Sequence, residues 1–362
     1  MQIGIVGLPN TGKSTLFETI TRAHLDLGAT AKNETHRSII KVPDKRLERL
    51  TEIFNPEKTT NATIEFVDVA GLKKGDSGST QFTNNFLSTV KTNDALLQIV
   101  RLFDNESVPH PEGANDIMRD ISTFETEFII SDLMILENRI DKINKQILKT
   151  GAEPFKKELE VLEKAYDLIH REIPLREADL NSIDLTILKT FSLLTLKPML
   201  IALNLDETLI DNAEGFVEQI RKFKSGKNTK IVSYLGKIER ELADLSDEDA
   251  EFFMAECGVK ESALHMLIRE AYELLSLQSF FTVGEDECRA WTIQKGMTAK
   301  QAAGAIHSDF VNKFIRAEVV GYDDFIEHGG SLAMVRERGV WRLEGKDYLV
   351  KDGDIISIRH SL

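Results

Sequence analysis

The sequence predicts an α/β fold: a doubly wound parallel sheet with an inserted helical hairpin, followed by a small β-rich module. Three observations carry this prediction. A short apolar strand near the N-terminus runs directly into a glycine-rich loop and a helix. Two helical patterns with heptad spacing interrupt the later strands, and from about residue 277 the chain changes to short β-rich runs. At roughly 150 residues per domain, 362 residues allow two to three domains.

Composition excludes several classes of protein. Apolar residues make up 42% of the chain, too many for a disordered tail. The net charge of −14 argues against a surface that coats nucleic acid everywhere, but it allows a local basic patch. No apolar stretch is long enough to span a membrane, and the first residues lack the pattern of a secretory signal. Cys257 and Cys288 show no pairing pattern, so we expect both thiols to be reduced. Together these observations predict a soluble, cytoplasmic protein.

The first strand and the loop after it form the clearest motif. Residues 3–6 are apolar and rich in β-branched side chains, and residues 7–14 read G-x-x-x-x-G-K-S before a helical pattern. The glycines let backbone N–H groups point at phosphate oxygens, and the helix N-terminus adds its positive end. Lys13 would reach the β- and γ-phosphates, and the Ser14 hydroxyl would bind Mg²⁺. The sequence therefore predicts a nucleotide-binding P-loop.

A second strand pattern supplies an acidic partner for the metal. Residues 63–67 alternate like a strand and lead into a D-x-x-G tetrapeptide that begins at Asp68 and ends at Gly71. Asp68 would hold Mg²⁺ through a water, and the N–H of Gly71 would meet the γ-phosphate. Leu72 follows, where Ras-like proteins use a glutamine to orient the attacking water, so hydrolysis needs another group.

A third buried strand ends in a tetrapeptide that should read the base. Residues 198–203 are apolar, and residues 204–207 read N-x-x-E, with Leu205 where guanine readers carry the lysine of N-K-x-D. The aspartate of that pattern accepts from the guanine N1–H and amino group, whereas adenine has no N1–H. We therefore predict an adenine-binding pocket that includes Asn204, Leu205 and Glu207. The alternative is a loop without base contact.

Together these motifs resemble the YchF family, also called Obg-like ATPases, within the Obg group of P-loop proteins. The resemblance covers nearly the whole chain. The segments that carry it are residues 4–10, 12–17, 65–72, 191–198, 204–207, 281–293, 346–348 and 351–354. The family binds and hydrolyses ATP in preference to GTP and associates with ribosomes, so the resemblance implies the same activity here.

The resemblance also implies roles for individual residues. The residues expected to hold the ATP phosphates are Asn10, Thr11, Gly12, Lys13, Ser14 and Thr15. Leu205 would meet the adenine through its backbone and stem. Asn10 resembles a P-loop asparagine that helps to place K⁺ in related enzymes, the alternative being a plain turn residue. His110 stands where the family has a histidine implicated in positioning the attacking water, the alternative being an exposed loop histidine.

Two segments depart from the family pattern. Before the second strand the family has a motif like N-Y-P-F-C-T-I-E-P, whose threonine caps Mg²⁺, and in the gap-free register that position is Lys32. Thr35 is the nearest substitute and the expected metal ligand, with Thr30 as a second candidate. The stretch after D-x-x-G keeps Gly75 and Gly78 but loses later glycines. Because the phosphate cradle is intact, these changes bear on the catalytic rate and its activation more than on binding.

Two helical patterns predict the inserted hairpin. Apolar residues recur with heptad spacing from Ile129 to Ile147 and again from Phe155 to Ile169. Two such seams across a short break form an antiparallel coiled-coil hairpin, which we place at about residues 122–196 within the nucleotide-binding domain. Its outer lysines belong to a solvated face or, as the resemblance favours, to a lever that contacts RNA or a protein partner.

The last part of the chain predicts a β-grasp module over residues 278–362, after a nucleotide-binding domain of residues 1–277. One helix at residues 298–309, with Thr298 as its N-cap, interrupts the β-rich runs. Those runs are residues 280–283, 289–293 and 355–358. The module resembles the TGS domain at the C-terminus of the family, which binds partners or RNA and carries no chemistry.

The preferred hypothesis is a slow ATPase whose nucleotide state sets its grip on a ribosomal partner, either rRNA or ribosomal proteins. It would act as a monomer, without a membrane. Mg²⁺ and Lys13 would neutralise charge on the phosphoryl group, and His110 would help to position water. The alternatives are a GTP-binding switch of Obg type, a nucleotide-stabilised scaffold with negligible turnover, and an RNA-binding protein with a vestigial P-loop.

Overall fold

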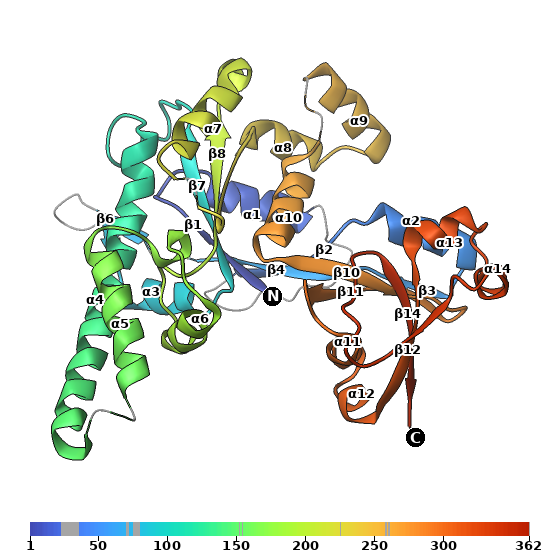
Figure 1. Ribbon diagram of the computed structural model, residues 1–362. Coiled ribbons are helices and arrows are strands. Elements are labelled where there is room, and N and C mark those ends of the chain that lie inside the picture. Colours follow the sequence, from blue (N-terminus) through green and yellow to red (C-terminus); the bar gives the residue numbers. More distant parts are fainter. Residues whose placement is uncertain are drawn as a thin grey trace. The chain divides into compact units, whose positions relative to one another are not determined.

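The structure is a computed structural model that divides into two compact units (Figure 1). It describes residues 1–22, 36–69, 72–74, 80–151, 153, 155–224, 226–257, 259 and 261–361. The first unit comprises Met1–Ser38 and Glu65–Glu270, and the second comprises Ile39–Ile64 and Ala271–Leu362. This division differs from the sequence prediction, which assigned residues 39–64 to the nucleotide-binding domain and placed the boundary after residue 277.

The first sheet has six strands in the order β2-β4-β1-β7-β8-β9. They are β2 (His36–Lys41), β4 (Thr63–Asp68), β1 (Gln2–Val6), β7 (Ala95–Leu102), β8 (Met199–Leu205) and β9 (Thr229–Tyr234). The pairs β1–β4, β1–β7, β7–β8 and β8–β9 are parallel, which confirms the predicted parallel sheet. Along the chain, β2 and β4 lie on one side of β1, and β7, β8 and β9 follow on its other side. The strand order therefore reverses beside β1, where open α/β sheets bind their ligands.

The strands of this sheet are apolar because both faces are covered. Every residue of β7 and β8 is buried, as expected for parallel strands packed on both sides. The helices that accompany them are α1 (Lys13–Arg22), α3 (Asn84–Lys91), α6 (Ser182–Leu188), α7 (Ala213–Arg221), α8 (Gly236–Leu242), α9 (Asp247–Glu256) and α10 (Ala263–Leu274). The shorter elements are the strands β5 (Leu72–Lys74) and β6 (Thr80–Phe82) and the 3₁₀ helices η1 (Leu175–Glu177), η2 (Lys189–Phe191) and η3 (Glu207–Asn212).

The predicted hairpin consists of α4 (Ile117–Thr150) and α5 (Lys156–His170), which pack against each other (Figure 1). All the predicted seam residues of both helices belong to one hydrophobic cluster, because heptad spacing keeps them on the facing sides. Arg139 and Glu158 join the helices through two hydrogen bonds of 2.7 and 3.0 Å. The first helix begins before the predicted insertion, and its early residues Phe124 and Phe128 belong to the core of the sheet.

The second unit contains a six-stranded mixed sheet in the order β13-β12-β14-β10-β11-β3. Its strands are β13 (Arg342–Glu344), β12 (Phe314–Gly321), β14 (Asp354–His360), β10 (Leu277–Thr282), β11 (Glu287–Gln294) and β3 (Lys58–Thr60). Its helices are α2 (Lys45–Phe54), α11 (Ala299–Ile306), α12 (Ser308–Lys313), α13 (Tyr322–Glu327) and α14 (Leu332–Glu337). The predicted single helix is divided at His307, whose extended backbone ends α11 and caps α12. Thr298 caps α11 as predicted, in a capping box with Gln301.

Segment 39–64 is an integral part of the second unit. β3 pairs with β11 in parallel, and the rings of Phe54 and Phe325 stack with centroids 5.7 Å apart. The guanidinium of Arg46 lies 2.8 Å from the carboxylate of Asp352. The sheet of the second unit thus takes its last strand from a region of the sequence far from the C-terminus.

Across the described ranges, none of the helices has the length and apolar composition that crossing a bilayer requires.

Candidate nucleotide-binding site

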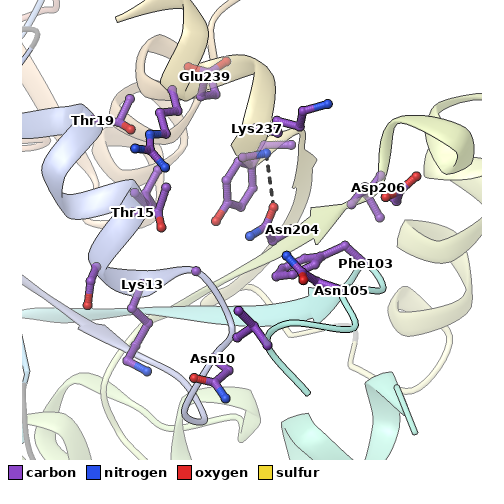
Figure 2. Close-up of a pocket in the computed structure, with 18 of the residues that line it drawn as sticks. Asn10, Lys13, Thr15, Thr19, Phe103, Asn105, Asn204, Asp206, Lys237 and Glu239 are labelled. Carbon is purple, nitrogen blue, oxygen red and sulfur yellow. Dashed lines mark hydrogen bonds between the residues drawn. The ribbon is translucent and has the colours of Figure 1, made fainter. Parts of the chain in front are cut away.

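A cavity of about 600 Å³ lies in the first unit at the carboxyl ends of the central strands (Figure 2). Five elements form its wall: the loop after β1 with α1, the loop after β7, the end of β8, the end of β9, and the start of α8. The predicted residues that line it are Asn10, Gly12, Lys13, Ser14, Thr15, Asn204, Leu205 and Glu207. The fold therefore brings the two ends of the predicted site, the P-loop and the base-reading tetrapeptide, to one cavity.

The loop between β1 and α1 has the tight backbone that a phosphate cradle needs. Asn10 and Gly12 both adopt left-handed conformations, with φ angles of 64° and 96°. A Cβ at Gly12 would lie 2.4 Å from Nδ2 of Asn204, so only glycine fits there. Inside the loop, the Thr11 hydroxyl donates to the Leu8 carbonyl at 3.0 Å. Thr11 thus fixes the loop from within, and its side chain is buried.

Lys13 extends along this loop and is largely shielded from water. Its ammonium donates to the carbonyl of Leu8 at 2.7 Å. Burial lowers the pKa of Lys13 to about 8, while the negative charge of Asp68 acts in the opposite direction. A nearby anion stabilises a buried cation, so this end of the cavity suits phosphate oxygens.

Two of the three predicted metal ligands lie in the described part of the chain. Ser14 is exposed in the first turn of α1, and Asp68 is the last residue of β4, opposite Ile5 in the register. A hydroxyl and a carboxylate suit Mg²⁺, which keeps several waters and binds substrate phosphates. The described residues contain no cluster of three or more His, Cys, Asp or Glu side chains around a possible metal position. Thr35 and Gly71, predicted for the metal and for the γ-phosphate, lie outside the described residues.

Asn204 joins the P-loop to the loop between β9 and α8. Its Nδ2 donates to the Thr11 carbonyl at 3.0 Å, and its Oδ1 accepts from the Gly236 N–H at 3.1 Å (Figure 2). A Cβ at Gly236 would lie 2.6 Å from that oxygen, so glycine is required there too. Asn204 thus holds the two sides of the cavity together, and Leu205 beside it is buried.

The acidic residues of the tetrapeptide have other partners. The carboxylate of Glu207 lies 2.9 Å from the ammonium of Lys237. Asp206 accepts hydrogen bonds from the N–H and the hydroxyl of Thr208, at 3.0 and 2.8 Å, and these bonds lower its pKa. Asp206 therefore caps the short helix η3, a local role that the sequence pattern did not reveal.

Several lining residues were missed by the sequence analysis. Figure 2 shows Phe103 and Asn105 facing the cavity from the loop after β7. Tyr234 lines it from the end of β9, and the surrounding protein buries its hydroxyl, which raises its pKa far above the ordinary value. All three follow or end a parallel strand, so the rule that ligands bind at the carboxyl ends of strands could have found them.

His110 is not among the described residues that line the cavity. It is buried, and its Nε2 lies 2.8 Å from Oδ2 of Asp120, with both side chains 2% exposed. Its Nδ1 accepts the Glu112 N–H at 3.1 Å, so Nε2 carries the proton and donates to Asp120. The alternative of an exposed loop histidine is therefore wrong. To act on a water in the cavity, the imidazole would have to free at least one of these two nitrogens from its hydrogen bond.

Two family models match the chain. One, described as "50S ribosome-binding GTPase", matches residues 2–205. The other, YchF-GTPase_C, described as "Protein of unknown function (DUF933)", matches residues 277–361.

Two relatives that align with nearly the whole chain share a name. The chain is 41% identical over 367 residues to "Ribosome-binding ATPase YchF" of Bacillus subtilis, covering 99% of each chain. It is 40% identical over 365 residues to the protein of that name from Haemophilus ducreyi, again covering 99% of each. A solved structure, "Structure of the Schizosaccharomyces pombe YchF GTPase", matches with a TM-score of 0.88 and 31% identity, covering 99% of this chain and 97% of that one. By sequence over its whole length, and by fold, the chain belongs to the YchF family.

Proposed function

We propose that this protein is an ATP-binding, slowly ATP-hydrolysing P-loop switch that associates with the ribosome. The observation that carries the proposal is the single cavity with a P-loop at one end and the N-x-x-E tetrapeptide at the other. The name "Ribosome-binding ATPase" of the relatives supports both the nucleotide and the partner. A cytoplasmic location follows from the ribosomal partner, and the protein acts as a monomer.

The phosphates would bind along residues 10–15. Backbone N–H groups of the loop, the N-terminus of α1 and the ammonium of Lys13 supply positive charge there. Ser14 and Asp68 would hold Mg²⁺, which neutralises charge on the β- and γ-phosphate oxygens. Thr35 and Gly71 are the proposed further contacts to the metal and the γ-phosphate. The amide nitrogen of Asn10 donates to the Pro109 carbonyl at 3.1 Å, and its amide oxygen would be the ligand for K⁺.

The base end of the cavity favours adenine over guanine. A guanine reader needs a carboxylate that accepts from the N1–H and the amino group. Here Glu207 is paired with Lys237, and Asp206 is engaged by Thr208. Leu205 and Phe103 add apolar contact area that suits a purine without that donor pair.

Hydrolysis needs a group that orients water, because Leu72 cannot. We propose His110 for this role in a state in which its loop has opened, since both imidazole nitrogens are engaged in the state described. Such a requirement would make turnover slow until a partner opens the loop.

Binding of labelled ATP and GTP tests the nucleotide preference. We expect ATP to bind at least about tenfold more tightly than GTP, and Lys13→Ala to weaken both. GTP binding tenfold tighter than ATP would overturn the preference for adenine. Unchanged binding in Lys13→Ala would instead favour an RNA-binding protein with a vestigial P-loop.

Single-turnover hydrolysis tests the enzyme. We expect slow release of phosphate from ATP, accelerated by ribosomes. If no phosphate is released with or without ribosomes, the protein is a nucleotide-stabilised scaffold. This result would leave the binding proposal intact and exclude the ATPase.

Cosedimentation with ribosomes tests the hairpin as a contact. Lys145 and Lys149 are exposed on α4, and neutralising both to Gln should weaken cosedimentation, more so at low salt. The matched control neutralises Lys222 and Lys227, exposed lysines outside the hairpin. Equal effects of the two pairs would exclude a specific hairpin contact.

A further inference from the structure

We infer that Arg101 is a positioning residue of the nucleotide cavity: its buried guanidinium ties the P-loop at Asn10 to the base wall at Phe103 and supplies positive charge toward the phosphates. The inference rests on the proposed function, because it concerns the same cavity. Arg101 itself does not line that cavity among the described residues, so it acts through its two neighbours.

The contacts of Arg101 reach both ends of the site. It lies near the end of β7 and is 2% exposed. Its Nη1 donates to the carbonyl of Asn10 at 3.1 Å, and its Nε donates to the carbonyl of Phe103 at 2.9 Å. The guanidinium also stacks on the ring of Phe103, 4.2 Å from its centroid. One planar group thus fixes a phosphate-binding backbone and an aromatic wall relative to each other.

The bond to Asn10 supports an unusual backbone. Asn10 has a φ of 64°, a conformation that side chains other than glycine adopt at some cost. Its carbonyl accepts from Arg101, and its side chain donates to the Pro109 carbonyl. The left-handed turn that aims the P-loop is therefore held from outside the loop as well as from within.

Among the described residues, Arg101 forms no salt bridge, and the hydrogen bonds of its guanidinium go to two backbone carbonyls. The negative charge of Asp104 acts on it without a direct contact. Burial lowers the pKa of Arg101, although a guanidinium stays protonated in proteins. By contrast, the buried Arg176 pairs with Glu125. A buried cation without a salt bridge is costly, and an anionic ligand nearby lowers that cost.

The tetrapeptide after β8 lacks a positive charge, which Arg101 of β7 carries nearby. In N-K-x-D the second position of the tetrapeptide carries a lysine, whereas Leu205 here has no charge. Arg101 lies opposite Asn204 in the parallel register of β7 and β8, one residue from the missing charge. Position 101 therefore places a cation beside Asn204, on the strand next to the tetrapeptide.

Binding of ATP, ADP and AMP to the full chain with Mg²⁺ tests the inference. We expect Arg101→Met to weaken ATP binding about tenfold or more, ADP less and AMP least, because the lost charge acts on the phosphates. Arg101→Lys keeps the charge but cannot stack on Phe103 while bonding both carbonyls. In Arg101→Lys the loss of affinity should be smaller than in Arg101→Met, and it should be equal for ATP, ADP and AMP.

The control is Arg139→Met, which removes the same charge from the hairpin and should leave all three affinities unchanged. Unchanged ATP affinity in Arg101→Met would overturn the inference. So would an equal loss for ATP, ADP and AMP that tracks a lower melting temperature, since it would indicate a merely structural role. If Arg101→Met does not fold, a common loss in Arg101→Lys at an unchanged melting temperature supports the inference. No loss, or a loss that tracks a lower melting temperature, overturns it. Wild-type protein that fails to bind ATP would contradict the proposed function instead.

Discussion

At the scale of single residues, Lys13 belongs to the P-loop motif, and its burial disfavours the charged form of its side chain. The fold buries its ammonium, which lowers its pKa from the ordinary 10.5 to about 8. Between these values the Lys13 side chain is protonated in the unfolded chain and neutral in the folded protein. The contribution of Lys13 to the free energy of unfolding should therefore rise with pH across that window.

The same shift predicts how nucleotide binding depends on pH. Phosphates favour the charged lysine, so the pKa of Lys13 should rise on binding, and ATP affinity should fall as pH increases above about 8, by up to tenfold per unit. Calorimetric titration at several pH values, in buffers of different ionisation enthalpy, should detect proton uptake. Lys13→Arg keeps its charge and should lose the pH slope. A wild-type affinity that does not change over this range would contradict the prediction.

His110 predicts a large effect on stability. In His110→Ala, Asp120 and the Glu112 N–H lose a buried partner, so the free energy of unfolding should fall by about 2–4 kcal/mol. Urea denaturation measures this loss. A variant that keeps its stability would contradict the prediction.

At the scale of secondary-structure elements, helix α4 connects the sheet to the hairpin. Its early turns pack in the sheet core, and its later turns form the seam with α5. Between them, the fully buried Asp132 accepts from the N–H groups of Leu194 and Thr195, at 3.0 and 2.7 Å, and from the Thr195 hydroxyl at 2.8 Å. This carboxylate fastens α4 to the segment that leads into β8.

Removing that carboxylate should loosen the element. We expect Asp132→Ala to lower the free energy of unfolding by about 3–5 kcal/mol, since three buried donors lose their acceptor. Asp132→Asn retains an acceptor oxygen and should lose less. Denaturation and amide exchange at Leu194 and Thr195 would measure both variants. Equal losses in the two would mean that packing, and not hydrogen bonding, sets the contribution.

The elements also show what the sequence could predict. A strand that leads into a motif, or a helix with heptad spacing, can be recognised from a short run of neighbouring residues. The sheet and the hairpin were therefore predicted correctly. The pairing of β3 with β11 has no local signature, because it depends on residues far apart in the chain. Phe103 and Asn105 were missed because no motif marks the loop after β7. The burial of His110 depends on Asp120, whose orientation only the tertiary structure determines.

At the scale of the whole molecule, the chain passes between its two units after Ser38, after Ile64 and after Glu270. Residues 271–362 therefore do not form the second unit by themselves. They need β3 to cover β11 and Phe54 to stack on Phe325.

This arrangement predicts that residues 271–362 alone are poorly stable. Joining residues 39–64 to them through a flexible linker should raise the free energy of unfolding by about 3 kcal/mol or more, through the restored strand, ring contact and ion pair. Denaturant unfolding of the two fragments measures the difference. Equal stability would show that segment 39–64 is only an attachment to the second unit.

The place of residues 39–64 in the second unit also limits how that unit can be exchanged between genes. A module encoded by one continuous stretch of a gene can be exchanged between proteins in a single recombination event. Here an exchange of the C-terminal stretch alone would transfer it without the strand β3 and the helix α2. Transfer of the intact second unit therefore requires residues 39–64 as well, and the relatives align with this chain over 99% of its length.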